Sequence, residues 1–191
     1  MLKAFKYRIY PSNSQKTLLT QAFGNSRFVY NNALAYKKEQ YEQNKNSVSC
    51  FDLINRLPNI KKEHEFLKLS PSQALQQSLK NLDSAYKDFF RRIKLGEKPG
   101  FPKFKSKFAK QTLSFPQGIK VDFNSSKINL PKIGNVLCVL HRKFTGIIKT
   151  CTVSKTQTNK YFISILVEDG NKVPIKTFGK TIAFDLGIKD F

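Results

Sequence analysis

The sequence contains few cysteines and histidines, and this shortage excludes two kinds of framework. Its three cysteines, Cys50, Cys138 and Cys151, are odd in number, lie far apart and form no CxxC pair. This pattern argues against a disulfide framework and against a zinc site within this chain. The two histidines, His64 and His141, stand alone, so we expect each to be a packed or surface side chain rather than a metal ligand.

Long apolar runs are also missing. The N-terminal stretch MLKAFKYRIY has no long apolar core, and no window of the sequence approaches the length of a membrane span. We therefore expect a cytoplasmic, reducing location and no membrane partner.

Acidic residues are few: 13 Asp and Glu stand against 34 Lys and Arg, which gives a formal net charge of +21 at pH 7. A field of this sign attracts polyanions, and the 17 Phe and 7 Tyr can supply surfaces on which unpaired bases stack. With 191 residues, 40% of them hydrophobic, the chain can form one sizeable domain or two small ones. Nucleic acid is the first partner that this composition indicates, and a solvated basic surface without a particular function is the alternative.

The chain begins with a strand and continues into helices. Residues 3–10 alternate, with Phe5, Tyr7 and Ile9 on one face, which is the period of a half-buried strand that Pro11 ends. Two short helices are then predicted, the first beginning at Ser12 or Asn13, and the second beginning at Asn25 or Ser26 after a turn at Gly24. Such a pair resembles a helix-turn-helix, and an ordinary packed helical hairpin remains the alternative.

A second helical region follows. Pro58 is expected to break the helix that begins near Asp52. The strongest helix begins with Ser70 as N-cap and Pro71 at the first helical position, and it carries an apolar stripe. Its other side is polar and basic, which suits contact with an anionic partner. The residues on this side are Gln73, Gln76, Gln77, Lys80, Lys87, Arg91 and Lys94.

Gly and Pro residues then mark a change of composition. The stretch KPGFPKFKSKFAK interleaves lysines, among them Lys103, Lys105 and Lys107, with three phenylalanines. Lysines suit a phosphate backbone and aromatic rings suit bases or sugars, so the stretch is a candidate nucleic-acid clamp. Alternatively, the phenylalanines fill a core and the lysines are solvated.

From residue 112 to residue 167 the pattern is that of short strands. Four β-branched runs without an intervening helix are separated by Gly, Pro, Asn and Ser, which favours a small antiparallel barrel. Because the first strand stands apart from these runs, we expect it to pair with the barrel across the helical insert. The chain closes on TIAFDLGIKDF, in which an apolar strand runs into Asp185. One carboxylate alone holds a divalent cation poorly, and metal sites usually need carboxylate partners.

Five stretches together carry a family resemblance. In chain order they are FKYRIYPSNSQKTLL, RFVYNNAL, SLKNLDSAYKDFF, GFPKFKSK and DLGIKDF. Their order and spacing resemble the TnpB (OrfB) proteins of insertion sequences, which are transposon-encoded RNA-guided DNA nucleases related to type V CRISPR effectors. The similarity spans residues 2–191.

The resemblance implies an α+β fold in which a small, wedge-like antiparallel β-barrel is split by an α-helical insert with a helix-turn-helix-like hairpin. The implied divisions are residues 1–10 for the first barrel strand, 11–98 for the helical recognition insert, and 99–178 for the remainder of the barrel. Residues 179–191 would begin a truncated RNase H-like (RuvC) nuclease domain.

The resemblance also implies partners and site residues. A guide RNA from the transposon end and a double-stranded target DNA with a short flanking motif would bind the barrel and insert. Gln76, with Gln73 and Gln77 nearby, would read the flanking motif, because a glutamine amide can donate to and accept from adenine in the major groove. Asp185 would be the first RuvC carboxylate and would hold Mg²⁺ or Mn²⁺ in complete relatives. The later carboxylates of the family and its zinc-binding element would lie beyond Phe191, so residues 1–191 alone should bind nucleic acid without cutting it.

Two alternatives stay open at this point. One is a non-catalytic or repressor-like nucleic-acid-binding module from a truncated element. The other is a basic structural RNA-binding protein unrelated to transposons.

Overall fold

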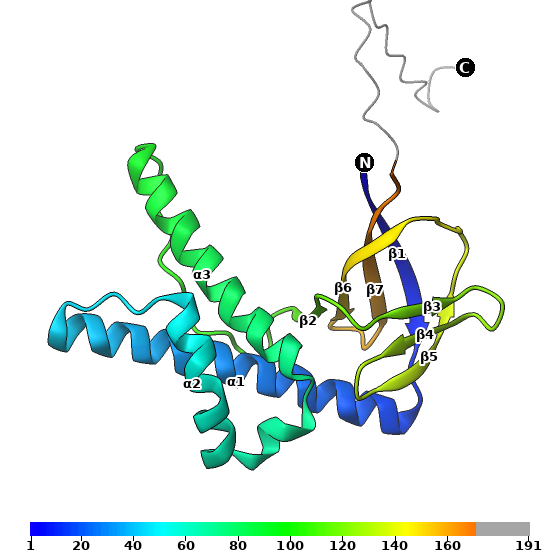
Figure 1. The fold of residues 1–191 in the computed structure, drawn as a ribbon, viewed down its shortest axis with the longest axis horizontal. Helices are drawn as coiled ribbons and strands as arrows, with labels where there is room; N and C mark the ends of the chain where they lie inside the picture. Colours follow the sequence, from blue (N-terminus) through cyan, green and yellow to red (C-terminus); the bar gives the residue numbers. More distant parts are fainter. Residues whose placement is uncertain (171–191) are drawn as a thin grey trace, which may run out of the picture.

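The structure is a computed structural model that describes residues 1–170 of the chain. It has a helical part and a curved antiparallel sheet, arranged side by side (Figure 1). The helical elements are α1 (Asn13–Asn44), α2 (Cys50–Glu63), the 3₁₀ helix η1 (Glu65–Leu69) and α3 (Ser72–Lys94). The strands are β1 (Leu2–Tyr10), β2 (Gln111–Phe115), β3 (Lys120–Asp122), β4 (Lys127–Leu130), β5 (Gly134–Val139), β6 (Ile147–Lys155) and β7 (Tyr161–Glu168).

The seven strands form one sheet in the order β2-β6-β7-β1-β5-β4-β3, with every neighbouring pair antiparallel. The first strand lies in the middle, where Ile9 pairs with Tyr161 of β7 on one side and with Cys138 of β5 on the other. The expectation that β1 pairs with the later strands across the helical insert is confirmed. The sheet curves into a half-barrel, so the fold is α+β with an antiparallel barrel-like sheet interrupted by helices (Figure 1).

A first hydrophobic core fills the inner side of the sheet. Tyr7 and Ile9 of β1 are both 1% exposed, as their alternation in the sequence predicts. The N-terminal half of α1 covers this core with Leu19, Ala22 and Phe23. The packing of α1 on the sheet thereby fixes the helical part relative to the half-barrel.

A second core joins the three helices. The C-terminal half of α1 contributes Val29, Tyr30, Ala33 and Leu34, which pack against leucines of α2, η1 and α3. Helix α1 contributes to both cores and so connects the helical part to the sheet (Figure 1), and Ala74 of α3 adds a second link to the first core.

The turn predicted at Gly24 is wrong. Helix α1 begins after the N-cap Ser12, as expected, but it continues through Gly24 to Asn44. A glycine inside a helix costs about 1 kcal/mol relative to alanine, and burial of Ala22 and Phe23 on one side of it and Val29 on the other outweighs this cost. The short connection between helices lies after Asn44 instead.

Two other predicted helix boundaries are also wrong. Helix α2 continues through Pro58, whose side chain is exposed, because Leu53 and Leu57 anchor the helix in the second core. Ser70 is not the N-cap of α3, and Pro71 takes that position. The buried Ser70 hydroxyl instead accepts a hydrogen bond of 2.8 Å from Asn25 Nδ2.

The two histidines are packed against aromatic rings, as expected for isolated histidines. His64 meets the ring of Phe28 edge to face with centroids 4.8 Å apart, and His141 meets Tyr7 in the same way at 5.3 Å. Within residues 1–170, none of the helices combines the length and apolar character needed to cross a membrane. The predicted nuclease strand within residues 179–191, Asp185 included, lies outside the described residues.

Candidate nucleic-acid interface

One face of helix α3 carries all seven of the polar and basic residues predicted on it. An α-helix turns about 100° per residue, and at this angle the seven fall within an arc of roughly 100°. The opposite side of α3 is buried against both cores through Ala74, Leu75, Ser78, Leu79 and Leu82. This α3 stripe runs for about 31 Å at 1.5 Å per residue and consists of Gln73, Gln76, Gln77, Lys80, Lys87, Arg91 and Lys94.

The glutamines occupy the first turns of this stripe. All three are half-buried, and Gln77 donates a hydrogen bond of 3.1 Å from Nε2 to Asn81 Oδ1. Among residues 1–170, neither Gln73 nor Gln76 has a hydrogen-bond partner for its side chain. The amides of Gln73 and Gln76 are therefore the two whose donor and acceptor groups are both available to a ligand.

The cations occupy the second half of the stripe. Lys87 forms an ion pair of 2.8 Å with Asp83, which raises the pKa of Lys87, and Arg91 Nε lies 3.5 Å from Asp88. Lys80 and Lys94 have no ion-pair partner in the described part of the chain. Exposed pairs of this kind contribute little free energy, so a phosphate can replace the carboxylate at small cost.

The lysine-rich segment after α3 is hydrogen-bonded to α1 through Asn31. Asn31 Oδ1 accepts a hydrogen bond of 2.8 Å from the Lys105 backbone, and Asn31 Nδ2 donates one of 3.0 Å to the Lys105 carbonyl oxygen. The Lys105 ammonium lies 4.0 Å from the centroid of the Tyr30 ring, and desolvation lowers the pKa of Lys105. Lys105 is thus bound to the helical part, although it is exposed like Lys103 and Lys107.

A second basic surface lies where this segment meets the sheet; the sequence predicted the lysines that the segment contributes, and not those that the sheet contributes. This lysine groove has a volume of about 820 Å³, and no acidic residue lines it. Lys6 of β1 lies with its ammonium 4.9 Å from the centroid of the Phe162 ring, and Arg8 lies 5.0 Å from the same centroid. The cations that line the groove are Lys6, Lys107, Lys110 and Lys155.

The register of the strands assembles the lysine groove. Phe162 of β7 pairs with Arg8 of β1 on one side and with Ser154 of β6 on the other, so these three side chains share one face of the sheet. Lys155, the last residue of β6, pairs with Tyr161 and lines the groove from the end of its strand. The sequence signal was the alternation that places Lys6 and Arg8 on the polar face of the first strand. The pairing of β6 with β7 that adds Lys155 has no such local signal.

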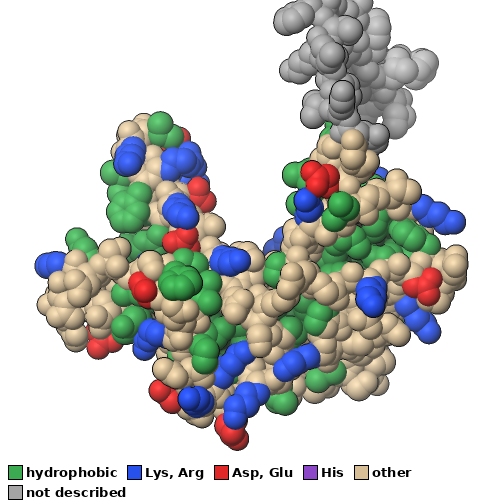
Figure 2. Space-filling model, in the orientation of Figure 1, with side chains coloured by type: hydrophobic (Ala, Val, Ile, Leu, Met, Phe, Trp, Pro, Cys, Tyr) green, Lys and Arg blue, Asp and Glu red, His purple; other side chains and the backbone are tan. Residues whose placement is uncertain are grey.

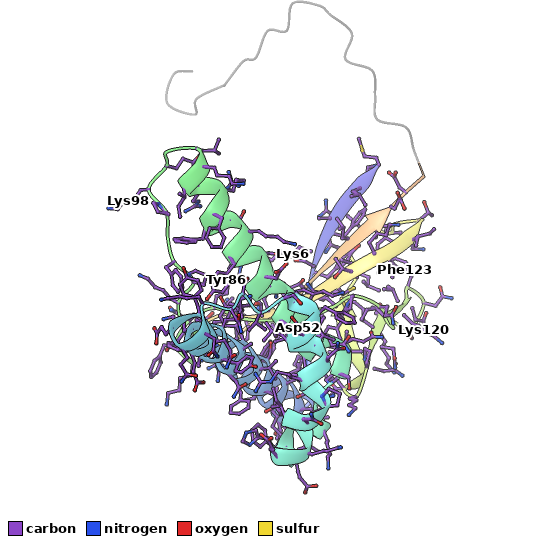
Figure 3. The ribbon with its side chains drawn as sticks, turned by 60° about the vertical axis from the view of Figure 1, so that its left-hand side comes forward. Lys6, Asp52, Tyr86, Lys98, Lys120 and Phe123 are labelled. Carbon is purple, nitrogen blue, oxygen red and sulfur yellow. The ribbon has the colours of Figure 1, made fainter. Side chains whose placement is uncertain are left out.

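The space-filling view shows the surface hollowed between the free end of α3 and the sheet, with Lys and Arg side chains on both sides of the hollow (Figure 2). Lys98, which follows α3, points away from the body of the molecule (Figure 3). The free end of α3 and the sheet thus both carry cations, and the surface between them is concave. An elongated polyanion fits this arrangement.

The candidate metal ligand cannot be compared with this geometry, because Asp185 lies outside the described residues. Within residues 1–170, no group of three or more His, Cys, Asp and Glu side chains is arranged to hold a metal ion.

The fold is similar to one solved nucleic-acid complex. The structure described as "Cryo-EM structure of the Cas12f1-sgRNA-target DNA complex" matches 92% of this chain and 49% of that chain, with a TM-score of 0.50 and 13% sequence identity. At 13% sequence identity the similarity concerns the fold alone. The helical insert and half-barrel of this chain thus have the same class of architecture as the matched part of that structure.

Sequence comparisons then identify the family. Residues 1–46 match the model HTH_OrfB_IS605, described as a helix-turn-helix domain. The chain is 36% identical over 189 residues to "Putative RNA-guided DNA endonuclease InsQ" of Escherichia coli (strain K12), and 28% identical over 191 residues to "Putative RNA-guided DNA endonuclease" of Streptomyces pristinaespiralis. These alignments cover 98% and 97% of this chain but 46% of each relative. The chain belongs to the OrfB (TnpB) family and spans about half the length of these curated relatives.

Proposed function

We propose that this chain is the guide-RNA-binding and target-DNA-binding part of an RNA-guided DNA endonuclease. The observation that carries the proposal is the presence of two basic surfaces, the α3 stripe and the lysine groove, on a molecule whose surface is hollowed between the free end of α3 and the sheet (Figure 2). The names of the two relatives describe the same activity, and the α3 stripe and the groove lie within the aligned residues.

The two surfaces have different roles in this proposal. The lysine groove and the basic half of the α3 stripe bind phosphates, which gives affinity for any strand with the right shape. Gln76, with Gln73 and Gln77, reads base edges in the short motif that flanks the target. The sequence of the target itself is read by pairing with the guide RNA, as in other RNA-guided systems.

The catalytic step belongs to residues outside the described part. Asp185 would hold a divalent cation, Mg²⁺ or Mn²⁺, which supplies Lewis acidity for phosphodiester hydrolysis. In a protein of the relatives' full length, Asp185→Ala should abolish chelator-sensitive cleavage of target DNA and leave guide binding unchanged. Guided cleavage by that variant, or by residues 1–191 alone, would show that the assignment is wrong.

The RNA that accompanies the protein tests the proposed partner. We expect RNA that copurifies with residues 1–191 to be dominated, after sequencing, by one structured transcript from the end of the transposon that encodes the chain. A broad mixture of cellular RNA in proportion to its abundance would contradict a guide-binding function and would favour a general RNA-binding protein.

A further inference from the structure

An aromatic groove on the helical part is separate from the lysine groove and adjoins the α3 stripe at Lys87. It has a volume of about 880 Å³ and lies between the C-terminal end of α1, the connection to α2, and α3. Tyr86 projects from α3 toward α1 (Figure 3), where Lys37 Nζ lies 5.0 Å from its ring centroid. The lining is mostly apolar and includes six aromatic side chains, which are Tyr41, Phe51, Tyr86, Phe89, Phe90 and Phe101.

The six rings divide into a packed set and an exposed set. Phe101 meets Tyr86 and Phe89 edge to face, with ring centroids 5.5 and 5.3 Å apart, so these three rings hold one another in place. The outer rings are unusually exposed for aromatic residues, with Phe51 at 70% and Phe90 at 55%. Among residues 1–170, the ring of Phe51 has no aromatic or cationic partner. Phe90 meets Phe89 edge to face with ring centroids 5.2 Å apart but is more than half exposed, so both outer rings have surface available for stacking.

Cations and hydrogen-bond acceptors surround the rings. Lys38 Nζ lies 5.2 Å from the Phe101 centroid, and Lys87 is 77% exposed at the side of the groove that joins the α3 stripe. Glu42 and Asp83 also line the groove and offer carboxylate oxygens. A deep phosphate would be repelled by these carboxylates, whereas a ribose 2′-hydroxyl can donate a hydrogen bond to them.

We propose that the aromatic groove binds one or two unpaired nucleotides of RNA. The bases stack on Phe51 and Phe90, the phosphates lie near Lys38 and Lys87, and a ribose hydroxyl faces the carboxylate of Glu42 or Asp83. Lys87 belongs to both the groove and the α3 stripe, so a strand bound along the stripe can place its unpaired end in the groove. The inference rests on the proposed function, because it assumes that RNA is the partner. It adds to that function a binding site for an unpaired segment of the RNA.

The test compares RNA hairpins with and without a short unpaired 3′ extension. Residues 1–191 should bind the extended hairpin at least about 5-fold more tightly than the blunt one, because stacking a base on an aromatic side chain contributes roughly 1–3 kcal/mol. The double variant Phe51→Ala/Phe90→Ala should lose this advantage and keep its affinity for the blunt hairpin. Phe66→Ala, which removes a ring that is 44% exposed outside the groove, should keep the advantage.

The other outcomes separate the inference from the proposed function. Failure of the unmodified chain to bind either hairpin would refute the function itself. Binding both hairpins equally, or losing affinity for both in the double variant, would refute the groove assignment alone. An equal advantage from a DNA extension would refute the choice of RNA. A dimer that dissociates in the double variant, seen by sedimentation, would show that the groove is instead a contact between two copies of the chain.

Discussion

Asn31 holds the backbone of Lys105 through two hydrogen bonds, accepting one of 2.8 Å from its N–H and donating one of 3.0 Å to its carbonyl oxygen. The two residues are 74 positions apart in the sequence. This contact fixes the middle of the lysine-rich segment on α1, between the end of α3 and the lysine groove.

Asn31→Ala should therefore release the segment. Two hydrogen bonds at about 0.5–1.5 kcal/mol each predict a loss of about 1–3 kcal/mol in the free energy of unfolding, measured by urea denaturation. Affinity for structured RNA should fall as well, because Lys103 and Lys107 would lose their fixed positions. Asn32→Ala is the matched control, since no side-chain hydrogen bond of Asn32 is found within residues 1–170. Equal stability of the two variants would show that the contact does not hold the segment.

The spacing of apolar residues in the sequence predicts the elements of this fold whose burial follows a simple repeat along the chain. The alternation in residues 3–10 and the short β-branched runs predicted the strands, because one face of each is buried. The breaks placed at Gly24 and Pro58 were wrong, because local propensity was outweighed by long-range packing. Phe23 and Leu34 anchor α1 on the two sides of Gly24, and Leu53 and Leu57 anchor the part of α2 that precedes Pro58.

Gln76 provides a test of specificity. If its amide reads a base edge, Gln76→Ala should cost about 1–3 kcal/mol on target DNA with the preferred flanking motif and little on a scrambled flank. Lys103→Ala should instead weaken binding to both DNAs to the same degree, because a phosphate contact is independent of sequence. Competition binding with guide-loaded protein measures both. Equal losses on the two flanks for Gln76→Ala would contradict the assignment.

Because of its buried thiols, the free energy of unfolding of the protein should depend on pH in the alkaline range. Desolvation raises the pKa of Cys151 from 9.0 to about 12. The folded state therefore keeps its proton where the unfolded state loses it, and the contribution to stability is full below pH 9 and decreases as the pH rises toward 12. At pH 10 this thiol alone should reduce the free energy of unfolding by about 1.4 kcal/mol.

The measurement is urea unfolding at pH 8 and pH 10. Cys151→Val removes the thiol with a similar volume and should lose less stability between the two values than the unmodified chain. Desolvation also raises the pKa of the half-exposed Cys50, so Cys50→Ser should lessen the alkaline loss too, but by less than Cys151→Val. An alkaline loss of the same size in Cys151→Val would show that the thiol does not contribute.

The candidate site was only partly predictable. The α3 stripe could be read from the sequence, because residues three, four and seven positions apart share a helix face. The lysine groove could not, because it depends on which strands pair and in which register. Lys6 and Lys155 are 149 positions apart, and only the placement of β7 between their strands brings them together.

The salt dependence of RNA binding tests the proposed nucleic-acid surface most directly. Residues 1–191 should bind structured RNA with an affinity that falls steeply between 50 and 200 mM salt on a log–log plot, each phosphate contact contributing roughly 0.7 to 0.9 to the slope. The double variant Lys6→Ala/Lys155→Ala should reduce that slope by about 1.4 to 1.8, while Lys62→Ala, on α2 outside the two basic surfaces, should leave it unchanged. A nearly flat salt response of the unmodified chain, or an unchanged slope in the double variant, would contradict the account.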